Sequence, residues 1–155
     1  YKNFDLGILI QGSYGGEILN IGKRYYENLE GNQNQLRTVL NRWKSEEEPG
    51  DGWMPRAYAN PTGQTSQVSS RWVEDGSYLR LNNVTLGYSF SNRILSRVNI
   101  ENLRIYLSAQ NPILITKYSG FNPEVNTSEN TVHAGSDHGV YPTSKSYSFG
   151  LNITF

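Results

Sequence analysis

The sequence predicts an all-β fold, made of antiparallel strands that form part of a large transmembrane β-barrel. Among its 155 residues are 11 Tyr and 15 Gly, with many Asn and Ser, a composition that favours strands and tight turns over helices. Four segments alternate apolar and polar residues with the period of two that indicates a strand. The connections between these segments alternate between long and short, which is typical of barrels with long extracellular loops and short periplasmic turns.

The first two predicted strands cover residues 2–14 and 77–91. In the first, the apolar residues share one parity: Phe4, Leu6, Ile8 and Ile10. In the second, Leu79 and Leu81 have one parity and the downstream apolar residues have the other: Val84, Leu86, Tyr88 and Phe90. Either a β-bulge lies near Asn82–Asn83, where the parity changes, or the upper part of this strand leaves the membrane.

The third and fourth predicted strands cover residues 101–111 and 145–155. Both alternate without a break, with these apolar residues in phase: Leu103, Ile105, Leu107 and Ala109 in the third, and Tyr147, Phe149, Leu151, Ile153 and Phe155 in the fourth. Strands of about 10 residues are long enough to cross the hydrocarbon layer at a tilt. Aromatic residues gather near the strand ends, as in the girdles at the two membrane interfaces.

The connecting segments 15–70 and 112–144 are predicted to be extracellular loops, because an antiparallel meander places both on one side of the membrane. Scattered apolar residues in 17–40 indicate one or two short helices, and the stretch 46–67 is rich in Pro, Gly, Asn and Ser. About four strands cannot close a barrel, since the smallest membrane barrels need about eight. We therefore expect the chain to be one piece of a larger barrel.

Several classes of function lack support in the sequence. Charges balance at 14 basic and 14 acidic residues, which gives no reason to expect a nucleic-acid partner, and the absence of cysteine excludes thiolate chemistry. His133 and His138 lie near Asp137 and could bind a metal together with Glu124 or Glu129, and the acidic run 46–48 with Asp51 could attract calcium. Solvated loop residues are the favoured interpretation of both sets. No Gly-x-Ser-x-Gly motif is present. We predict no enzyme activity, no catalytic residue, no cofactor and no metal.

Two alternatives to a membrane transporter stay open from the strand pattern. A soluble β-sandwich binding module also has one buried face on each strand, so alternation by itself does not exclude it. An outer-membrane barrel of another function would share every feature described above. The unequal loops and the aromatic strand ends favour a barrel over a sandwich.

Several stretches resemble the SusC/RagA-type TonB-dependent outer-membrane transporters. Residues 71–88 (RWVEDGSYLRLNNVTLGY) are similar to a signature of that family, and residues 103–112 (LRIYLSAQNP) to one of its strands. The loop YSGFNPEV at 118–125 and the final stretch SYSFGLNITF at 146–155 resemble family segments as well. The departures are modest, with Pro112 where the family usually has Leu or Phe and Trp72 where it often has Phe.

This resemblance implies a full-length barrel of roughly 22 strands, of which the chain would be the C-terminal part without the plug domain. It implies import of oligosaccharides or peptides across the cell outer membrane of a Bacteroidetes-type Gram-negative bacterium, with energy delivered by TonB. The implied partners are the rest of the barrel and its plug, a SusD-like surface lipoprotein, the barrel-assembly machinery and outer-membrane lipid. The loops would be extracellular and the C-terminus periplasmic.

Two sets of residues are candidates for a site. Substrate could stack on or hydrogen-bond to lumen and loop residues, namely Arg104, Tyr106, Gln110, Trp53, Tyr58 and Tyr118. The favoured alternative for any one of them is a structural contact: Arg104 with the plug or a neighbouring strand, and the loop aromatics with the loops or the lipoprotein. The second set resembles the signal read by the assembly machinery: Tyr147, Phe149, Leu151, Ile153 and Phe155.

Overall fold

The computed structural model describes residues 2–60, 62–63, 67–91, 95–96, 99–125 and 135–155. The chain divides into two compact units. The first, here named the strand unit, comprises residues 1–15, 77–117 and 142–155, and the second, the loop unit, comprises 16–76 and 118–141. None of the helices in the described part of the chain has the length and apolar character needed to span a membrane.

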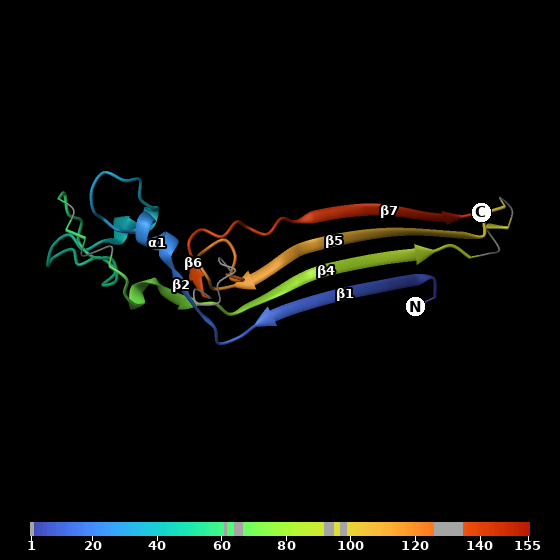
Figure 1. Ribbon diagram of the computed structural model, residues 1–155, viewed down its shortest axis with the longest axis horizontal. Helices are drawn as coiled ribbons and strands as arrows, with labels where there is room; N and C mark the ends of the chain where they lie inside the picture. The colour runs from blue at the N-terminus through green and yellow to red at the C-terminus, as the bar shows by residue number, and fades with distance from the viewer. Residues whose placement is uncertain (1, 61, 64–66, 92–94, 97–98, 126–134) are drawn as a thin grey trace. The chain divides into compact units, whose positions relative to one another are not determined.

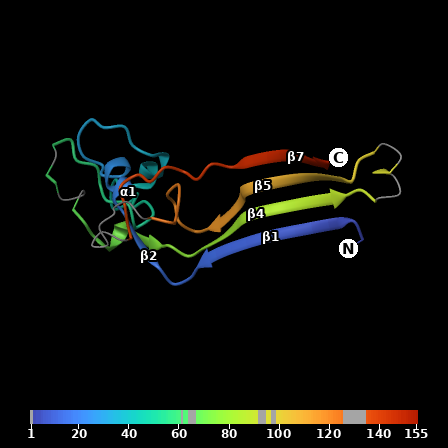
Figure 2. The same cartoon turned by 45° about the vertical axis from the view of Figure 1, so that its right-hand side comes forward.

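The strand unit is one four-stranded antiparallel sheet. Its strands are β1 (Phe4–Ser13), β4 (Tyr78–Ser89), β5 (Asn102–Thr116) and β7 (Ser146–Thr154), which lie side by side in the order β1-β4-β5-β7 (Figures 1 and 2). The bounds of β1, β4 and β7 fall within two residues of those expected from the sequence. Consecutive long strands of the sheet are neighbours, so the sheet is a simple meander.

The third strand is longer than the sequence indicated. β5 continues to Thr116, so the expectation of a loop beginning at residue 112 was wrong. Proline cannot donate a ladder hydrogen bond, so Pro112 is an unusual residue inside a strand. Here it lies in an irregularity: the register passes from Asn83↔Gln110 to Leu81↔Ile113, and Asn111 has a positive φ of 49°. Proline is tolerated at a bulge of this kind.

A β-bulge at Asn82 explains the change of parity in β4. In the pairing of β1 with β4, Leu9 lies opposite Asn83 and Ile10 lies opposite Leu81, so Asn82 is the extra residue. The first of the two alternatives drawn from the sequence is therefore confirmed. Because of the inserted residue, the apolar residues on both sides of Asn82 point to the same side of the sheet.

The sheet has one apolar and one polar face, since residues directly opposite one another on antiparallel strands share a face. The register places the following residues on the apolar face: Phe4, Leu6, Ile8, Ile10, Leu79, Leu81, Val84, Leu86, Tyr88, Leu103, Ile105, Leu107, Ala109, Ile113, Ile115, Tyr147, Phe149, Leu151 and Ile153. Many of these are more than half exposed, among them Leu107 at 58% and Phe149 at 70%. A soluble monomer rarely exposes so large a continuous apolar surface.

The loop unit contains a second, small sheet that was not foreseen. β2 (Glu17–Asn20) pairs antiparallel with β3 (Val73–Asp75) and parallel with β6 (Ser136–Asp137). Segments 15–70 and 112–144 were expected to be loops without strands, and each contains one of these strands. Strands of two to four residues are too short to display a periodic pattern, which is why the sequence did not reveal them.

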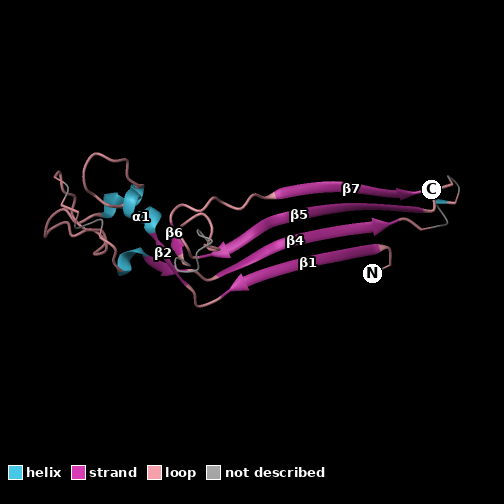
Figure 3. Ribbon diagram, in the orientation of Figure 1, coloured by secondary structure: helices cyan, strands magenta, loops and turns pink. Residues whose placement is uncertain are grey.

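Short helices complete the loop unit (Figure 3). The α-helix α1 (Ile21–Tyr26) begins at Asn20, whose side-chain oxygen accepts a hydrogen bond from Lys23 N at 3.0 Å, as an N-cap does. The 3₁₀ helices η1 (Arg37–Asn41) and η2 (Ser70–Trp72) follow. The buried apolar side chains of the unit include Ile18, Ile21, Leu29, Met54, Trp72 and Tyr118. They form the core to which the short elements are attached.

Candidate functional site

The polar face of the strand unit has an ion pair that reaches across one strand. Arg104 on β5 donates from Nε and Nη2 to the two carboxylate oxygens of Asp5 on β1, at 3.1 and 2.6 Å. β4 lies between these two strands, and Gly87, the register partner of Asp5, is the residue beneath the pair. A β-carbon at Gly87 would overlap both charged groups. The glycine therefore provides the space that this bidentate pair occupies.

Tyr106 continues this layer across the polar face. Its ring covers Gly150, the register partner on β7, where a β-carbon would overlap the ring. The Arg104 guanidinium carbon lies 5.3 Å from the centre of the Tyr106 ring. Further along the strand, Gln110 accepts a hydrogen bond from Ser146 Oγ at 3.2 Å. Thus all three candidate lumen residues contact other strands of the same sheet, Arg104 across the intervening β4.

The residues of the resembled assembly signal lie at one edge of the sheet. Tyr147, Phe149, Leu151 and Ile153 belong to β7, which pairs only with β5 among the described strands. All four lie on the apolar face and are exposed, and Phe155, just past the strand, is 82% exposed. These side chains therefore lie exposed on the apolar face of the strand unit.

In the loop unit, the carboxylate of Glu74 joins two segments that are far apart in the sequence. It accepts hydrogen bonds from the Ser119 backbone N at 2.9 Å, from Ser119 Oγ at 2.8 Å and from Asn20 Nδ2 at 3.1 Å. Lys23 Nζ forms an ion pair with it at 3.3 Å. Burial raises the pKa of Glu74, but the hydrogen bonds from Ser119 and the charge of Lys23 together lower the pKa below its usual value. Glu74 is thus ionised at neutral pH. Its contacts with Ser119 and Lys23 join the two segments of the loop unit, residues 118–141 and residues 16–76.

Tyr118 and Asp137 form a second buried polar contact in the same unit. The Tyr118 hydroxyl donates to Asp137 Oδ2 at 2.5 Å, and Asp137 Oδ1 accepts from the backbone N of Gly139 and Val140 at 2.7 and 2.9 Å. Burial, followed by the nearby carboxylate, raises the pKa of Tyr118. Tyr118 is only 5% exposed. It therefore packs the loop unit, which agrees with the alternative that the sequence analysis favoured.

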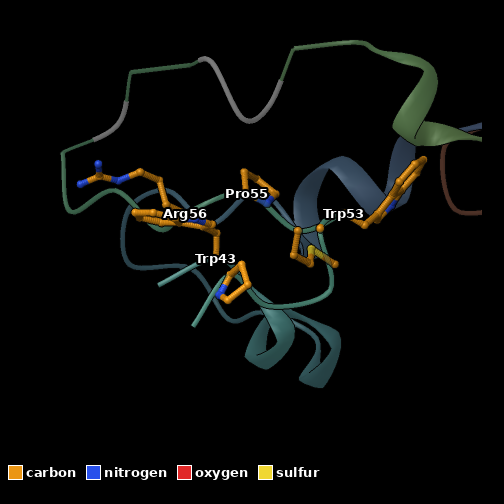
Figure 4. A pocket seen from close by; sticks show the side chains of 7 residues that line it. Trp43, Trp53, Pro55 and Arg56 are labelled. Atoms are coloured by element: carbon orange, nitrogen blue, oxygen red, sulfur yellow. The ribbon is translucent and has the colours of Figure 1, made fainter. Parts of the chain in front are cut away.

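Trp53 and Tyr58 lie in an exposed aromatic region of the loop unit. A hollow of about 350 Å³ is lined by Trp43, Pro49, Gly52, Trp53, Met54, Pro55 and Arg56. Figure 4 shows Trp43 and Trp53 on either side of Pro55, with the Trp53 indole and the Arg56 guanidinium pointing away from one another. The Arg56 guanidinium carbon lies 5.8 Å from the centre of the Trp43 ring and 5.2 Å from that of Tyr58. We name this region the tryptophan hollow.

The backbone that bears the tryptophan hollow is held by its own hydrogen bonds. Trp43 N donates to Met54 O at 3.1 Å, and Asp51 N donates to Asn41 O at 3.1 Å. The Asp51 carboxylate accepts from the backbone N of Trp53 and Met54, both at 2.8 Å. The hydrogen bond from the Met54 backbone N, followed by that from Trp53, lowers the pKa of Asp51. The two indoles are therefore presented by a pre-ordered loop.

Among the described residues, no group of three or more His, Cys, Asp or Glu side chains is arranged to hold a metal ion. His133 and Glu129, two of the residues considered from the sequence, lie outside the described residues. Sequence reasoning also missed Trp43 and Arg56, although the sequence has only three Trp and two of them line one hollow. It missed Glu74 as well, since its partners Lys23 and Ser119 are distant in the sequence.

Comparison with known proteins finds relatives named as TonB-dependent receptors. No family model matches it. It is 35% identical over its whole length to TonB-dependent receptor P3 of Formosa agariphila, and 28% identical to TonB-dependent receptor SusC of Bacteroides thetaiotaomicron. The chain spans 15% and 14% of the lengths of these two relatives.

The fold has matches among solved structures too. The structure of the RagAB peptide transporter superposes with a TM-score of 0.81 at 28% sequence identity, over 99% of this chain and 16% of the matched chain. The structure of the RagAB peptide importer in its closed-closed state gives the same TM-score over the whole chain.

These likenesses, together with a sheet whose one face is apolar and exposed, define the chain as a wall segment of the β-barrel of a TonB-dependent receptor. The chain belongs to the SusC/RagA-type TonB-dependent receptors. The open alternative of a soluble β-sandwich is thereby set aside.

Proposed function

We propose that this chain forms part of the wall and the surface loops of a transporter that imports oligosaccharides or peptides with energy delivered through TonB. The observation that carries this proposal is the apolar face, which runs unbroken over four paired strands because the bulge at Asn82 restores its phase. Such a face is what the lipid-exposed side of a barrel wall requires. The peptide transport stated for the RagAB structures and the kinship with SusC support an import function.

The strand connections support an orientation in the membrane. The segments that join β1 to β4 and β5 to β7 are long and include the whole loop unit, whereas the link from β4 to β5 is short. Because consecutive strands of this sheet are antiparallel, both long connections leave from the same end of the strands. We place them on the extracellular side and the short link and the C-terminus on the periplasmic side. A SusD-like lipoprotein would then dock on the loops, while TonB would act through parts of the protein outside this chain.

Cysteine labelling at two adjacent positions of β5 tests the assignment of the two faces. Ala109 lies on the apolar face and Ser108 on the polar face, and both are small, so that cysteine perturbs neither position greatly. In full-length transporter freed of other cysteines, we expect Ala109→Cys to react with a maleimide dissolved in the lipid phase. Ser108→Cys should react only with a water-soluble maleimide.

The two cysteine variants control for each other, because they share a strand and differ by one residue. A one-residue slip of register would exchange their faces. Labelling of Ser108→Cys by the lipid-phase reagent, with Ala109→Cys protected, would refute the assignment and with it the proposed membrane wall.

The role of β7 in assembly stays a prediction, supported by the alternation and exposure of its aromatic residues. A strand at a sheet edge is the natural element for edge pairing with assembly machinery. Replacing Phe155 with Asp should lower the surface level of the full-length transporter several-fold more than Asn152→Asp on the polar face. Whole-cell antibody labelling measures both levels, and equal levels for the two variants would leave Phe155 as an ordinary interface aromatic.

A further inference from the structure

The strand unit has a hollow that spans three neighbouring strands. Its volume is about 410 Å³, which falls within the range of about 300 to 1,000 Å³ typical of small-molecule pockets. We name it the Ala109 hollow. It is lined by Val84 and Leu86 on β4, by Leu107, Ser108 and Ala109 on β5, and by Tyr147, Ser148 and Phe149 on β7.

The strand register explains how the Ala109 hollow arises on the apolar face. Ala109 lies between Val84 and Tyr147 in one row across the sheet. The β-carbons of directly opposite residues are about 4.5 to 5.5 Å apart, so each side chain normally fills the space beside its neighbours. Ala109 has the smallest side chain of the residues assigned to this face, and it leaves that space unfilled. The next row has larger side chains throughout: Leu86, Leu107 and Phe149.

The Ala109 hollow offers hydrocarbon and little else to a ligand. Ser108 and Ser148 lie opposite each other on the polar face, where the Ser108 hydroxyl is 3.1 Å from Thr85 Oγ1. Their contribution to the lining is therefore backbone, whose polar groups are engaged in the ladders of the sheet. Tyr147 alone, among the described apolar-face residues of the lining, has a side-chain polar group. A polar ligand would lose its hydrogen bonds to water here without replacing them.

The position of the Ala109 hollow favours a lipid chain as its occupant. The hollow is continuous with the apolar face, which the proposed barrel wall turns toward lipid. A void inside hydrocarbon is costly because the atoms that line it lose their dispersion contacts. An acyl chain is narrow and flexible, so it can enter between the two rows and contact the sides of Leu107 and Phe149, which are 58% and 70% exposed.

The surroundings of the Ala109 hollow are less suited to a second copy of the protein. Close contact between protein segments inside a membrane favours several small residues, because these allow the backbones to approach. The residues that flank Ala109 on the apolar face are branched or aromatic, and Tyr147 at the rim is 72% exposed. A single small residue among large ones admits a single chain and keeps a second protein surface at a distance.

We infer that the Ala109 hollow binds one acyl chain of an outer-membrane lipid and holds it more tightly than the rest of the apolar face holds lipid. This inference rests on the proposed membrane wall. It adds a fixed lipid to a surface along which the other lipids exchange.

Filling the Ala109 hollow tests the inference. The full-length transporter is purified from outer membranes into detergent that contains no lipid, and native mass spectrometry counts the lipids that stay bound. Ala109→Ile should lose one of the lipids that the wild type retains, because the larger side chain occupies the space of the acyl chain. Isoleucine suits a strand, so the sheet itself should be preserved. Equal retention by the two proteins would overturn the inference.

Ile115→Phe is the matched control. Ile115 is on the same strand and the same face, is 63% exposed and does not line the Ala109 hollow. Added bulk at this position should leave the retained lipid unchanged. Loss of the same lipid in both variants would show a general disturbance of the face and overturn the inference. A wild-type dimer that dissociates in Ala109→Ile with no change in lipid would assign the hollow to a second copy and overturn it too.

A photoreactive lipid locates the chain in the unaltered protein, so that the inference does not depend on the folding of a variant. The wild-type transporter is reconstituted in vesicles containing phosphatidylethanolamine with a diazirine in one acyl chain, returned to lipid-free detergent and then irradiated. Peptide mass spectrometry should find the label at Ala109 and Phe149 and not at Leu79 or Ile115. Label spread evenly over the apolar face would overturn the fixed site.

The cysteine labelling of β5 described above separates this inference from the membrane wall on which it rests. If Ala109→Cys reacts from the lipid phase while Ala109→Ile retains every lipid, the wall stands and the fixed lipid is overturned. If Ser108→Cys reacts from the lipid phase instead, the wall itself is overturned.

Discussion

Replacing Trp72 with alanine is expected to lower the free energy of unfolding of the loop unit by about 3 to 5 kcal/mol, the usual cost of truncating a large buried aromatic residue. Trp72 is 0% exposed, and its Nε1 donates to Gln67 O at 2.9 Å. The Arg71 guanidinium carbon lies 4.0 Å from the centre of the ring. Alanine would leave a cavity, an unpaired carbonyl and an arginine without its stacking partner.

Hydrogen exchange of the full-length transporter measures this effect on the loop unit. Backbone amides in residues 16–76 should exchange faster by about two to three and a half orders of magnitude in the variant, because about 1.4 kcal/mol corresponds to a factor of ten. Trp53→Ala is the matched control, since it removes the same side chain from a position that is 58% exposed. Equal loss of protection in both variants would show that Trp72 is not the centre of this core.

Replacing Leu107 with arginine should destabilise the protein folded in the membrane by about 2 to 4 kcal/mol, the cost of a cation on the lipid face near mid-bilayer. Leu107 lies on the apolar face between Leu86 and Phe149, and it is 58% exposed within the sheet. Apolar side chains surround it on the neighbouring strands. A charge placed there would enter hydrocarbon with no partner to neutralise it.

Ser108→Arg is the control for the Leu107 variant, because it places the same charge one residue away on the polar face. Urea titration of the transporter refolded into lipid vesicles compares their stabilities. We expect Ser108→Arg to fall within about 1 kcal/mol of the wild type, as lumen positions tolerate charge. If the two variants were destabilised equally, the apolar face would not be in contact with lipid.

The sequence predicted the strands well because a period of two is a local signal. Each of β1, β4 and β7 contains enough alternating residues to be recognised by itself. Even the bulge left a local trace, the change of parity at Asn82. The end of β5 was missed for the same reason: Pro112 is a local stop signal, and only the pairing with β4 shows that the strand continues.

The candidate site was less predictable because its contacts are distant in the sequence. Asp5 and Arg104 lie 99 residues apart, and the Arg104 side chain was foreseen only as lumen-facing. The short strands β2, β3 and β6 exist because tertiary contacts such as Glu74 with Ser119 hold them together. Tyr118 resembled Trp53 as a loop aromatic, yet one is buried and the other exposed. Burial in an irregular segment is decided by packing, which no periodic pattern encodes.

The bulge at Asn82 has a consequence for how the chain tolerates changes in length. Deleting this one residue would turn Leu79 and Leu81 to the polar face while the partners Ile10 and Ile113 stayed on the apolar face. No single substitution repairs such a defect, because every side chain beyond the deletion changes sides. Lengthening a surface loop costs little, since the entropy of closure grows only with the logarithm of loop length. Insertions and deletions among relatives should therefore accumulate in the connections and be excluded from the middle of β4.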